Sequence, residues 1–257
     1  MTVTVAGEPM LAYLLASVRI VAWLLVVPPF STRAVPTMAK VVLSLALAFT
    51  IAPLLAESQV PLTLGALAVT VVTQAAVGAA LGFLTSLMFA AVAAAGALVD
   101  VFGGFALSQG FDPLGQQGNT VFGTFHQWLF TVLLFVSGGH LLVLGGLLRT
   151  FEIVPIGTSP DTSGGTGLMT AAFSLFFTVA VQIALPMIAV LFVADLGLAM
   201  MTKIAPQLNA LNVMFPAKIG LTLILVGLSF PVLPTVADRV VDHAMDAMGA
   251  FASGGGG

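Results

Sequence analysis

The sequence predicts an all-α membrane protein of about six long, kinked hydrophobic helices arranged in hairpins. Hydrophobic residues make up 59% of the 257 residues and charged residues only 7%, whereas soluble domains carry about 25% charged residues. The mean hydropathy of +1.15 agrees with this. The apolar runs are continuous, which argues against membrane β-strands, because these alternate apolar and polar residues over about 10 positions.

Six apolar segments are candidates for these helices, because roughly 20 apolar helical residues cross a bilayer core about 30 Å thick. We place them near residues 10–27, 36–55, 61–99, 121–148, 168–202 and 215–236. The third segment contains no charged residue and is almost twice the necessary length. It therefore forms either one long tilted helix or two shorter ones.

Prolines mark the expected starts and kinks of these helices. The first helical turn tolerates the missing N–H of proline, and the prolines at such places are Pro36, Pro61 and Pro216. Prolines inside helices or near their ends bend the chain, and these are Pro53, Pro186, Pro231 and Pro234.

The last part of the chain is more polar. Asp238, Asp242 and Asp246 recur at every fourth position of residues 237–251, so they line one face of an amphipathic or solvent-facing helical extension. We expect that acidic face to be solvated. Residues 253–257 are expected to be a flexible glycine tail. No basic region precedes the first apolar run, so we expect a retained helix rather than a cleaved signal peptide.

Residues 100–120, here called the glycine-rich segment, are the first functional candidate. Glycines alternate there with large apolar side chains, and irregular backbone at membrane depth survives only when it is buried in protein or lines a cavity. The alternative is a re-entrant or interfacial loop that only packs. The candidate residues are Phe102, Gly103, Gly104, Phe105, Leu107, Gly110, Phe111, Asp112 and Pro113.

A stripe of small residues follows one face of the third apolar segment. Its members recur every four residues and are Gly78, Gly82, Ser86, Ala90 and Ala94. Small side chains at this spacing let helix backbones approach closely. We therefore expect this face to pack against another helix, either of this chain or of a partner.

Two charged residues lie inside apolar segments. Arg19 is midway along the first and Asp195 is similarly placed in the fifth; a charge at membrane depth is costly unless it is paired or hydrated. They form a structural pair, face a watery cavity, or belong to a proton or ion relay. His126 and His140 are about 20 Å apart along a helix, too far to share a metal, and we expect hydrogen-bonded interior histidines.

The sequence gives little support for catalysis, metal binding or nucleic-acid binding. The chain has no cysteine, and it contains no zincin, nucleophile-elbow or Walker pattern. The carboxylates form no tight inward pair on an apolar segment, and the net charge of −3 argues against nucleic acid. We therefore predict that the protein is not an enzyme and that it has no metal site and no cofactor.

Two proline-bearing turns resemble each other. In one, Pro28-Pro29-Phe30 precedes Val35-Pro36 and Lys40; in the other, Ala205-Pro206-Gln207-Leu208-Asn209 precedes Phe215-Pro216 and Lys218. A lysine early in a helix faces the unfavourable end of the helix dipole. We therefore expect each lysine to reach an interface or to neutralise a carboxylate of a partner.

These residues carry a resemblance to a known family. Arg19 followed by Pro28, Phe30, Pro36 and Lys40 is similar to the opening of the FliR family of type III secretion export-gate subunits. Four further motifs follow in the family's order over about residues 10–245: Phe111-Asp112-Pro113, Gly138-Gly139-His140-Leu141, Pro155-Ile156-Gly157, and Ala205-Pro206-Gln207-Leu208-Asn209 with Phe215-Pro216. One departure stands out: Phe102 precedes Gly103 where many relatives carry glutamine, which leaves a plug of bulky apolar groups intact.

The resemblance implies a role in protein export. Residues 1–252 would be one export-gate domain, FliP-like over about 10–150 and ending in a FliQ-like helical hairpin over about 165–250. The chain would join FliP-type, FliQ-type and FlhB-type subunits in a helical assembly of the flagellar basal body, in the bacterial inner membrane. That assembly would enclose a pore for unfolded flagellar proteins in transit, and the glycine-rich segment would plug it when closed. The residues assigned to assembly are Arg19, Pro28, Pro36, Lys40, Gly78, Gly82, Pro206, Gln207, Asn209, Pro216 and Lys218.

Two other functions compete with this one. A small-solute or ion transporter would use Arg19 and Asp195 as substrate contacts, and it would work alone or as a homo-oligomer. A membrane-embedded enzyme would lose turnover when one polar residue is changed. An export subunit, by contrast, should be unstable alone and co-purify with two different small membrane proteins.

Overall fold

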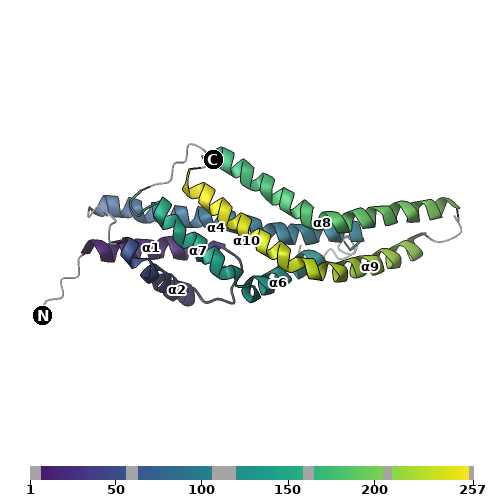
Figure 1. Ribbon diagram of the computed structural model, residues 1–257, viewed down its shortest axis with the longest axis horizontal. Coiled ribbons are helices and arrows are strands. Elements are labelled where there is room, and N and C mark those ends of the chain that lie inside the picture. Colours follow the sequence, from purple (N-terminus) through teal and green to yellow (C-terminus); the bar gives the residue numbers. More distant parts are fainter. Residues whose placement is uncertain (1–6, 56–62, 106–119, 159–164, 205–209, 255–257) are drawn as a thin grey trace. The chain divides into compact units, whose positions relative to one another are not determined.

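The computed structural model of the chain describes residues 7–55, 63–105, 120–158, 165–204 and 210–254 (Figure 1). Across these ranges the only regular elements are helices, which confirms the all-α prediction. They are α1 (Gly7–Val26), α2 (Thr37–Thr50), α3 (Ala52–Leu55), α4 (Leu64–Gly103), α6 (Val121–Val136), α7 (Gly139–Ile153), α8 (Gly165–Ile204), α9 (Ala210–Ser229), the 3-10 helix η1 (Phe230–Val232) and α10 (Leu233–Ala252).

Four helical stretches in the described ranges are long and apolar enough to cross a membrane. They are Pro9–Val26, Leu64–Gly103, Gly165–Met201 and Met214–Ala252. Helix α4 is continuous over 40 residues, so the third apolar segment is one helix rather than two. At 1.5 Å per residue it measures about 60 Å, roughly twice the hydrocarbon core of a bilayer.

The second and fourth segments are not the single long helices that we expected. The second is divided into α2 and α3, because Pro53 follows closely after Thr50, the last residue of α2, and proline cannot continue a helical hydrogen-bond ladder. The fourth is divided into α6 and α7 by a break at Ser137 and Gly138. Gly138 there has φ of +78°, a left-handed conformation that ends helices.

The sixth segment begins earlier than expected. Helix α9 starts at Ala210, so Pro216 lies inside the helix and not in its first turn. Residues 210–215 contain neither glycine nor proline, so nothing in the local sequence stops the helix from extending there. Pro186 lies inside α8, and Pro231 lies in η1, which separates α9 from α10. Pro61 falls outside the described residues.

The chain forms two compact units, which are described separately. Unit 1 comprises Met1–Leu87, His140–Phe173 and Val241–Gly257, and unit 2 comprises Met88–Gly139 and Ser174–Val240. In unit 1, α1 packs against α2, and Tyr13 donates a hydrogen bond of 3.0 Å to the backbone oxygen of Leu45. Gly78 and Gly82 of α4 lie against the backbone of α1, at Arg19 and Trp23 respectively.

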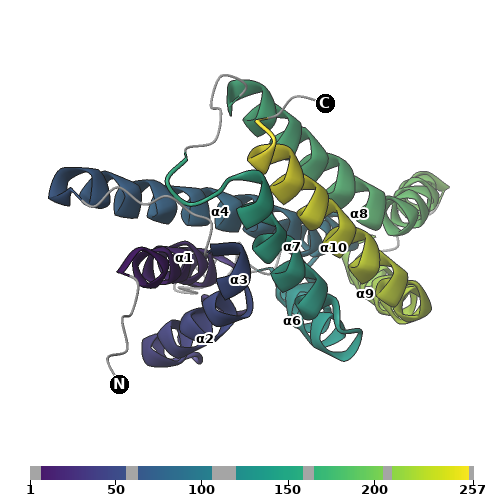
Figure 2. The ribbon, with the colours of Figure 1, turned by 60° about the vertical axis from the view of Figure 1, so that its left-hand side comes forward.

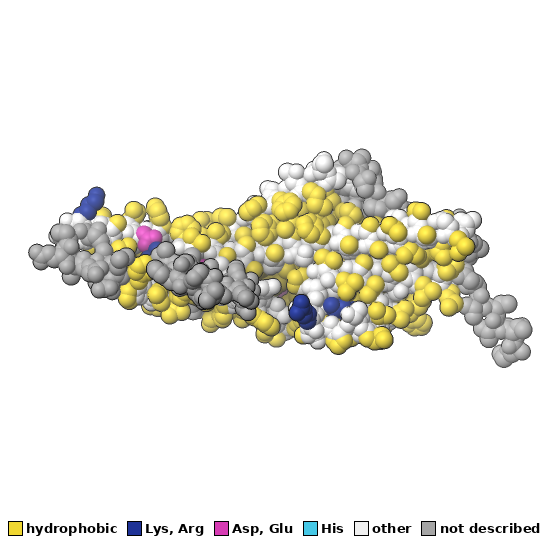
Figure 3. Space-filling model, turned by 180° about the vertical axis from the view of Figure 1, so that it is seen from behind, with side chains coloured by type: hydrophobic (Ala, Val, Ile, Leu, Met, Phe, Trp, Pro, Cys, Tyr) yellow, Lys and Arg dark blue, Asp and Glu magenta, His cyan; other side chains and the backbone are white. Residues whose placement is uncertain are grey.

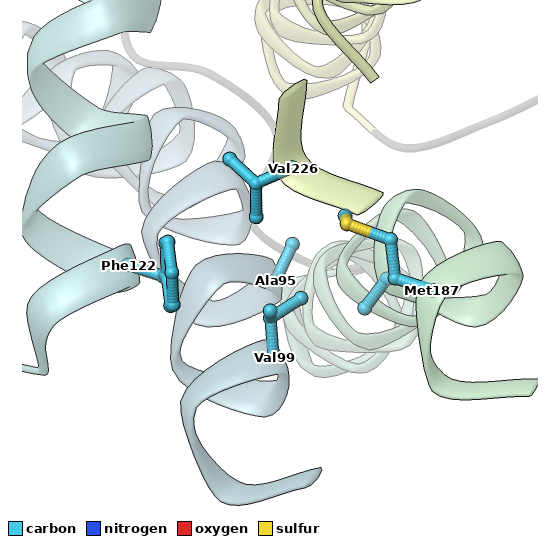
Figure 4. Close-up of a cluster of buried hydrophobic side chains, with 6 residues drawn as sticks. Ala95, Val99, Phe122, Met187 and Val226 are labelled. Atoms are coloured by element: carbon cyan, nitrogen blue, oxygen red, sulfur yellow. The ribbon is translucent and has the colours of Figure 1, made fainter. Parts of the chain in front are cut away.

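Unit 2 has a hydrophobic core formed by four helices. Figure 4 shows its side chains converging from α4, α6, α8 and α9. The buried members are Ala95, Val99, Phe122, Ala184, Met187 and Val226. This core includes Val99, which directly precedes the glycine-rich segment.

Large apolar side chains also cover much of the surface. Figure 3 shows hydrophobic side chains spread over one face, with only a few charged side chains among them. In unit 2, Phe177 of α8 is 63% exposed and Leu228 of α9 is 69% exposed. Such a surface needs lipid or another protein to cover it.

Candidate functional site at the base of the glycine-rich segment

The glycine-rich segment begins later than the sequence predicts. Residues 100–103 continue α4, so Phe102 and Gly103 lie in its last turn rather than in a loop. Burial explains the extension, because Val99, Asp100 and Gly103 are all buried. Gly104 then ends the helix with φ of +85°, which favours glycine. The other candidates, Leu107, Gly110, Phe111, Asp112 and Pro113, lie outside the described residues.

Gly103 is a point of close approach between α4 and α9. A Cβ atom added at Gly103 would lie 2.8 Å from Oγ1 of Thr222, which is closer than van der Waals contact allows. Thr222 is fully buried, and its hydroxyl donates a hydrogen bond of 2.8 Å to the backbone oxygen of Lys218. A side chain at position 103 would therefore require the Thr222 side chain or α9 itself to shift.

Phe105 anchors the start of the segment to the core of unit 2. Its ring lies edge-on to the ring of Phe122, with the centroids 4.9 Å apart. Edge-to-face pairs at this distance are favourable by about 0.5–1.5 kcal/mol beyond the area that they bury. The first large apolar side chain after α4 is thus packed inward, against the first turn of α6.

Asp100 joins the two ends of the glycine-rich segment. Its Oδ2 accepts hydrogen bonds from the backbone N–H groups of Phe122 at 2.8 Å and Gly123 at 3.3 Å. These groups belong to the first turn of α6, where N–H groups have no intrahelical partner and the helix dipole favours a negative charge. The carboxylate is fully buried and so caps α6 from the end of α4.

His126 lies one helical turn beyond Phe122 and is also buried. Its Nδ1–H donates a hydrogen bond of 2.8 Å to the backbone oxygen of Phe122. The prediction of a hydrogen-bonded interior histidine is therefore confirmed at this position. Among the described residues, no group of three or more histidine or acidic side chains is arranged to hold a metal ion.

The hairpin of α8 and α9 contains an ion pair. Lys218 Nζ lies 2.8 Å from Oδ1 of Asp195 and donates a hydrogen bond of 3.0 Å to its Oδ2. Asp195 lies on the same face of α8 as the buried Ala184, Met187 and Leu191. The lysine thus neutralises a carboxylate of its own chain.

Arg19 is held in unit 1 by groups without charge. Its Nε donates to Oε1 of Gln74 at 2.7 Å, and its Nη2 donates to the backbone oxygen of Val154 at 2.9 Å. Nη1 donates to the oxygen of Thr150 at 3.4 Å, and the guanidinium stands 4.1 Å from the ring centroid of Phe151. The two backbone oxygens lie at the C-terminal end of α7, which the helix dipole makes negative. Arg19 therefore ties α1 to α4 and α7.

Arg19 and Asp195 have separate partners, in unit 1 and unit 2 respectively. Of the remaining assembly candidates, Pro36 directly precedes α2 and Lys40 is buried within α2. Pro206, Gln207 and Asn209 lie outside the described residues.

Sequence reasoning missed Asp100 and Gln74 as functional positions. Asp100 was a detectable signal, since it is the one carboxylate among residues 61–111. Its partner was not detectable, because nothing in the sequence shows which N–H groups a buried carboxylate will reach. The same is true of Gln74, which is fully buried and separated from Arg19 by 55 residues.

Comparison with known proteins identifies relatives of this sequence. The family model of bacterial export proteins, family 1, matches residues 10–244. A flagellar biosynthetic protein FliR of Pectobacterium carotovorum is 30% identical over 231 residues, covering 90% of this chain and 88% of that protein. The FliR of Escherichia coli K12 is 29% identical, with the same coverage of each. The secretion system apparatus protein SsaT of Salmonella typhimurium is 28% identical over 60% of this chain and 60% of its own length.

Proposed function

The chain belongs to the bacterial export proteins, family 1, the family of FliR, and we propose that it is a structural subunit of the flagellar type III export gate. The match over residues 10–244 is the observation that carries this proposal. The chain would line and plug the pore through which unfolded flagellar proteins cross the bacterial inner membrane at the flagellar basal body. It would act as a structural subunit and would not catalyse a reaction.

The exposed apolar surface supports assembly with other subunits. Helices α4 and α8 each have 40 residues, about 60 Å of helix, so a bilayer core of about 30 Å covers only part of each when they cross it upright. The remaining apolar surface needs other polypeptides around it. FliP-type, FliQ-type and FlhB-type subunits are the partners that we propose.

The base of the glycine-rich segment supports a plug. Asp100 and Phe105 fasten the start of the segment to the first turn of α6, into which the segment leads, while the glycines within it allow backbone conformations closed to other residues. Its apolar side chains would exclude water from the closed pore, because a dewetted constriction blocks ion flow. We propose that this fixed base lets the glycines and aromatic side chains that follow it in the sequence act as a plug.

The plug is tested by removing residues 103–110 in cells that also express the partner subunits. We expect ion conductance across the membrane to rise, because the apolar obstruction is lost. Removal of residues 158–165, another glycine-containing stretch of eight residues, is the matched control and should leave the membrane tight. Co-purification of the partners shows whether each shortened chain still assembles. Unchanged conductance in an assembled gate would refute the plug.

Assembly is tested by purifying the chain from its native membrane. We expect two other small membrane proteins to accompany it and the chain to be degraded when they are absent. The partners of Arg19 and Asp195 within this chain favour this over a transporter, because both charges are engaged in holding helices together. A chain that is stable alone and moves a solute would overturn the proposal.

A further inference from the structure

A groove of about 850 Å³ runs between α7 and the C-terminal part of α10, within unit 1. The two helices lie side by side (Figure 2) and contact each other at Gly146, where an added Cβ atom would lie 2.9 Å from Cε of Met248. Gly146 also lines the groove, so this helix contact borders it.

Small residues from both helices line the groove. Gly145 of α7 and Gly249 of α10 line it, and a Cβ atom added at either would meet no other atom within 4 Å. They contrast with Gly146, where the space for a Cβ atom is occupied by the side chain of Met248. Open glycines on two adjacent helices let the backbone of a third helix approach closely.

Part of the lining of the groove is apolar and exposed. Leu141, Leu142 and Ile153 line it and are 63%, 55% and 48% exposed. Three large aliphatic side chains around open glycines have the anatomy of a helix-binding groove, in which alternating anchors of an apolar helix insert. Burying them would be favourable by about 25 cal/mol for each Å² removed from water.

The charges around the groove indicate what kind of helix fits. Glu152 and Asp246 line it together with a single cation, Arg149. Asp242 continues the acidic face of α10 and is exposed, as Asp246 is. Within the described parts of the chain none of these side chains forms an ion pair, the recorded pair being Lys218 with Asp195. The excess of acid favours a basic group on the occupant and disfavours an anionic lipid headgroup.

We propose that this groove binds an apolar helix of another subunit of the export assembly. That helix would place small residues, spaced by four, over Gly145 and Gly249, and a lysine or arginine opposite Glu152 and Asp246. The inference rests on the proposed function and goes beyond it by assigning a docking surface and the chemistry of its occupant.

A photo-crosslinking residue at Leu142 tests the proposal in native membranes, with the same residue at Leu228 of α9 for comparison. We expect the Leu142 product to contain a peptide from an apolar helix of a co-purifying subunit that carries lysine or arginine. Products containing only lipid, or only a helix without a basic residue, would overturn the inference.

Filling the groove provides the second test. Gly145→Leu should reduce co-purification of that subunit at least tenfold and reduce swimming, while the chain itself is still made. Gly167→Leu, where a Cβ atom also meets no neighbour, is the control and should have no effect. Asp246→Lys should weaken binding, and an acidic replacement of the subunit's basic residue should restore it. Normal co-purification of the subunit with the Gly145→Leu chain would overturn the proposal that the groove binds a helix.

Deletion of the whole chain separates the two proposals. If the deletion stops flagellar export but Gly145→Leu does not weaken assembly, the groove inference fails and the proposed function stands. If cells without the chain still export flagellar proteins, the proposed function itself fails, and with it the assignment of the occupant to the export assembly.

Discussion

The carboxylate of Asp100 accepts a hydrogen bond of 2.8 Å from the backbone N–H of Phe122, 22 residues further along the chain. This bond brings the end of α4 to the start of α6 and thereby sets the two ends of the glycine-rich segment together. A carboxylate at a helix N-terminus is favoured both by the unpaired N–H groups and by the helix dipole. The segment therefore starts and ends at one fixed place.

Asp100→Ala should destabilise unit 2. It leaves the N–H groups of Phe122 and Gly123 without their buried acceptor, which costs about 1–3 kcal/mol. Thermal unfolding of the purified assembly in detergent would measure the loss. Asp100→Asn keeps one acceptor oxygen, so its loss of stability should be smaller. Asp238→Ala, at an exposed position, should have the stability of the wild type. An Asp100→Ala assembly with the unfolding temperature of the wild type would contradict the capping role.

Arg19→Lys should loosen unit 1 even though it keeps the charge. One ammonium group cannot reproduce the planar fork that reaches Gln74, Thr150 and Val154. Hydrogen bonds from a charged donor contribute about 1.5–3 kcal/mol each, so we expect a loss of about 2–3 kcal/mol in the free energy of unfolding. Protease resistance of α1 and α7 in membranes reports it. Arg33→Lys, at an exposed site, is the control. If the two variants resist protease equally, Arg19 does not hold α1 to α4 and α7.

Gly96→Ala should separate α4 from α6. A Cβ atom at position 96 would overlap the backbone oxygen of Phe122, and a backbone atom cannot turn aside as a flexible side chain can. Overpacking of this kind costs about 1–3 kcal/mol. Gly220→Ala, where the added carbon meets no other atom within 4 Å, should be neutral. The amount of assembled complex in membranes distinguishes the two, and normal assembly of Gly96→Ala would disprove the close packing.

Lys218→Met should destabilise the hairpin of α8 and α9. It leaves Asp195, which is 33% exposed at its side chain, without its counter-ion. Partial exposure keeps the expected effect on the order of 1 kcal/mol. The exchange of both residues, Lys218→Asp with Asp195→Lys, should recover part of the loss in a double-mutant cycle. A cycle with no coupling between the two positions would show that the pair does not stabilise the hairpin.

The sequence by itself determined the class of the protein and the main course of its helices. Hydrophobicity and its period are local properties, so a run such as residues 61–99 predicts α4 whatever surrounds it. The acidic face of Asp238, Asp242 and Asp246 followed from spacing alone, and each of these residues is exposed. The motifs placed the chain in its family for the same reason, because each of them is a short stretch of consecutive residues.

Only the tertiary structure decided which buried polar groups meet. Arg19 reaches the oxygen of Val154 across 135 residues, and Asp100 reaches Phe122 across 22; no local pattern encodes either distance. The break after α6 was likewise hidden, because Gly138 is compatible with a helix until packing selects its positive φ. Most buried polar groups are hydrogen-bonded, but the partner's identity depends on which helices pack together, and that is a property of the whole fold.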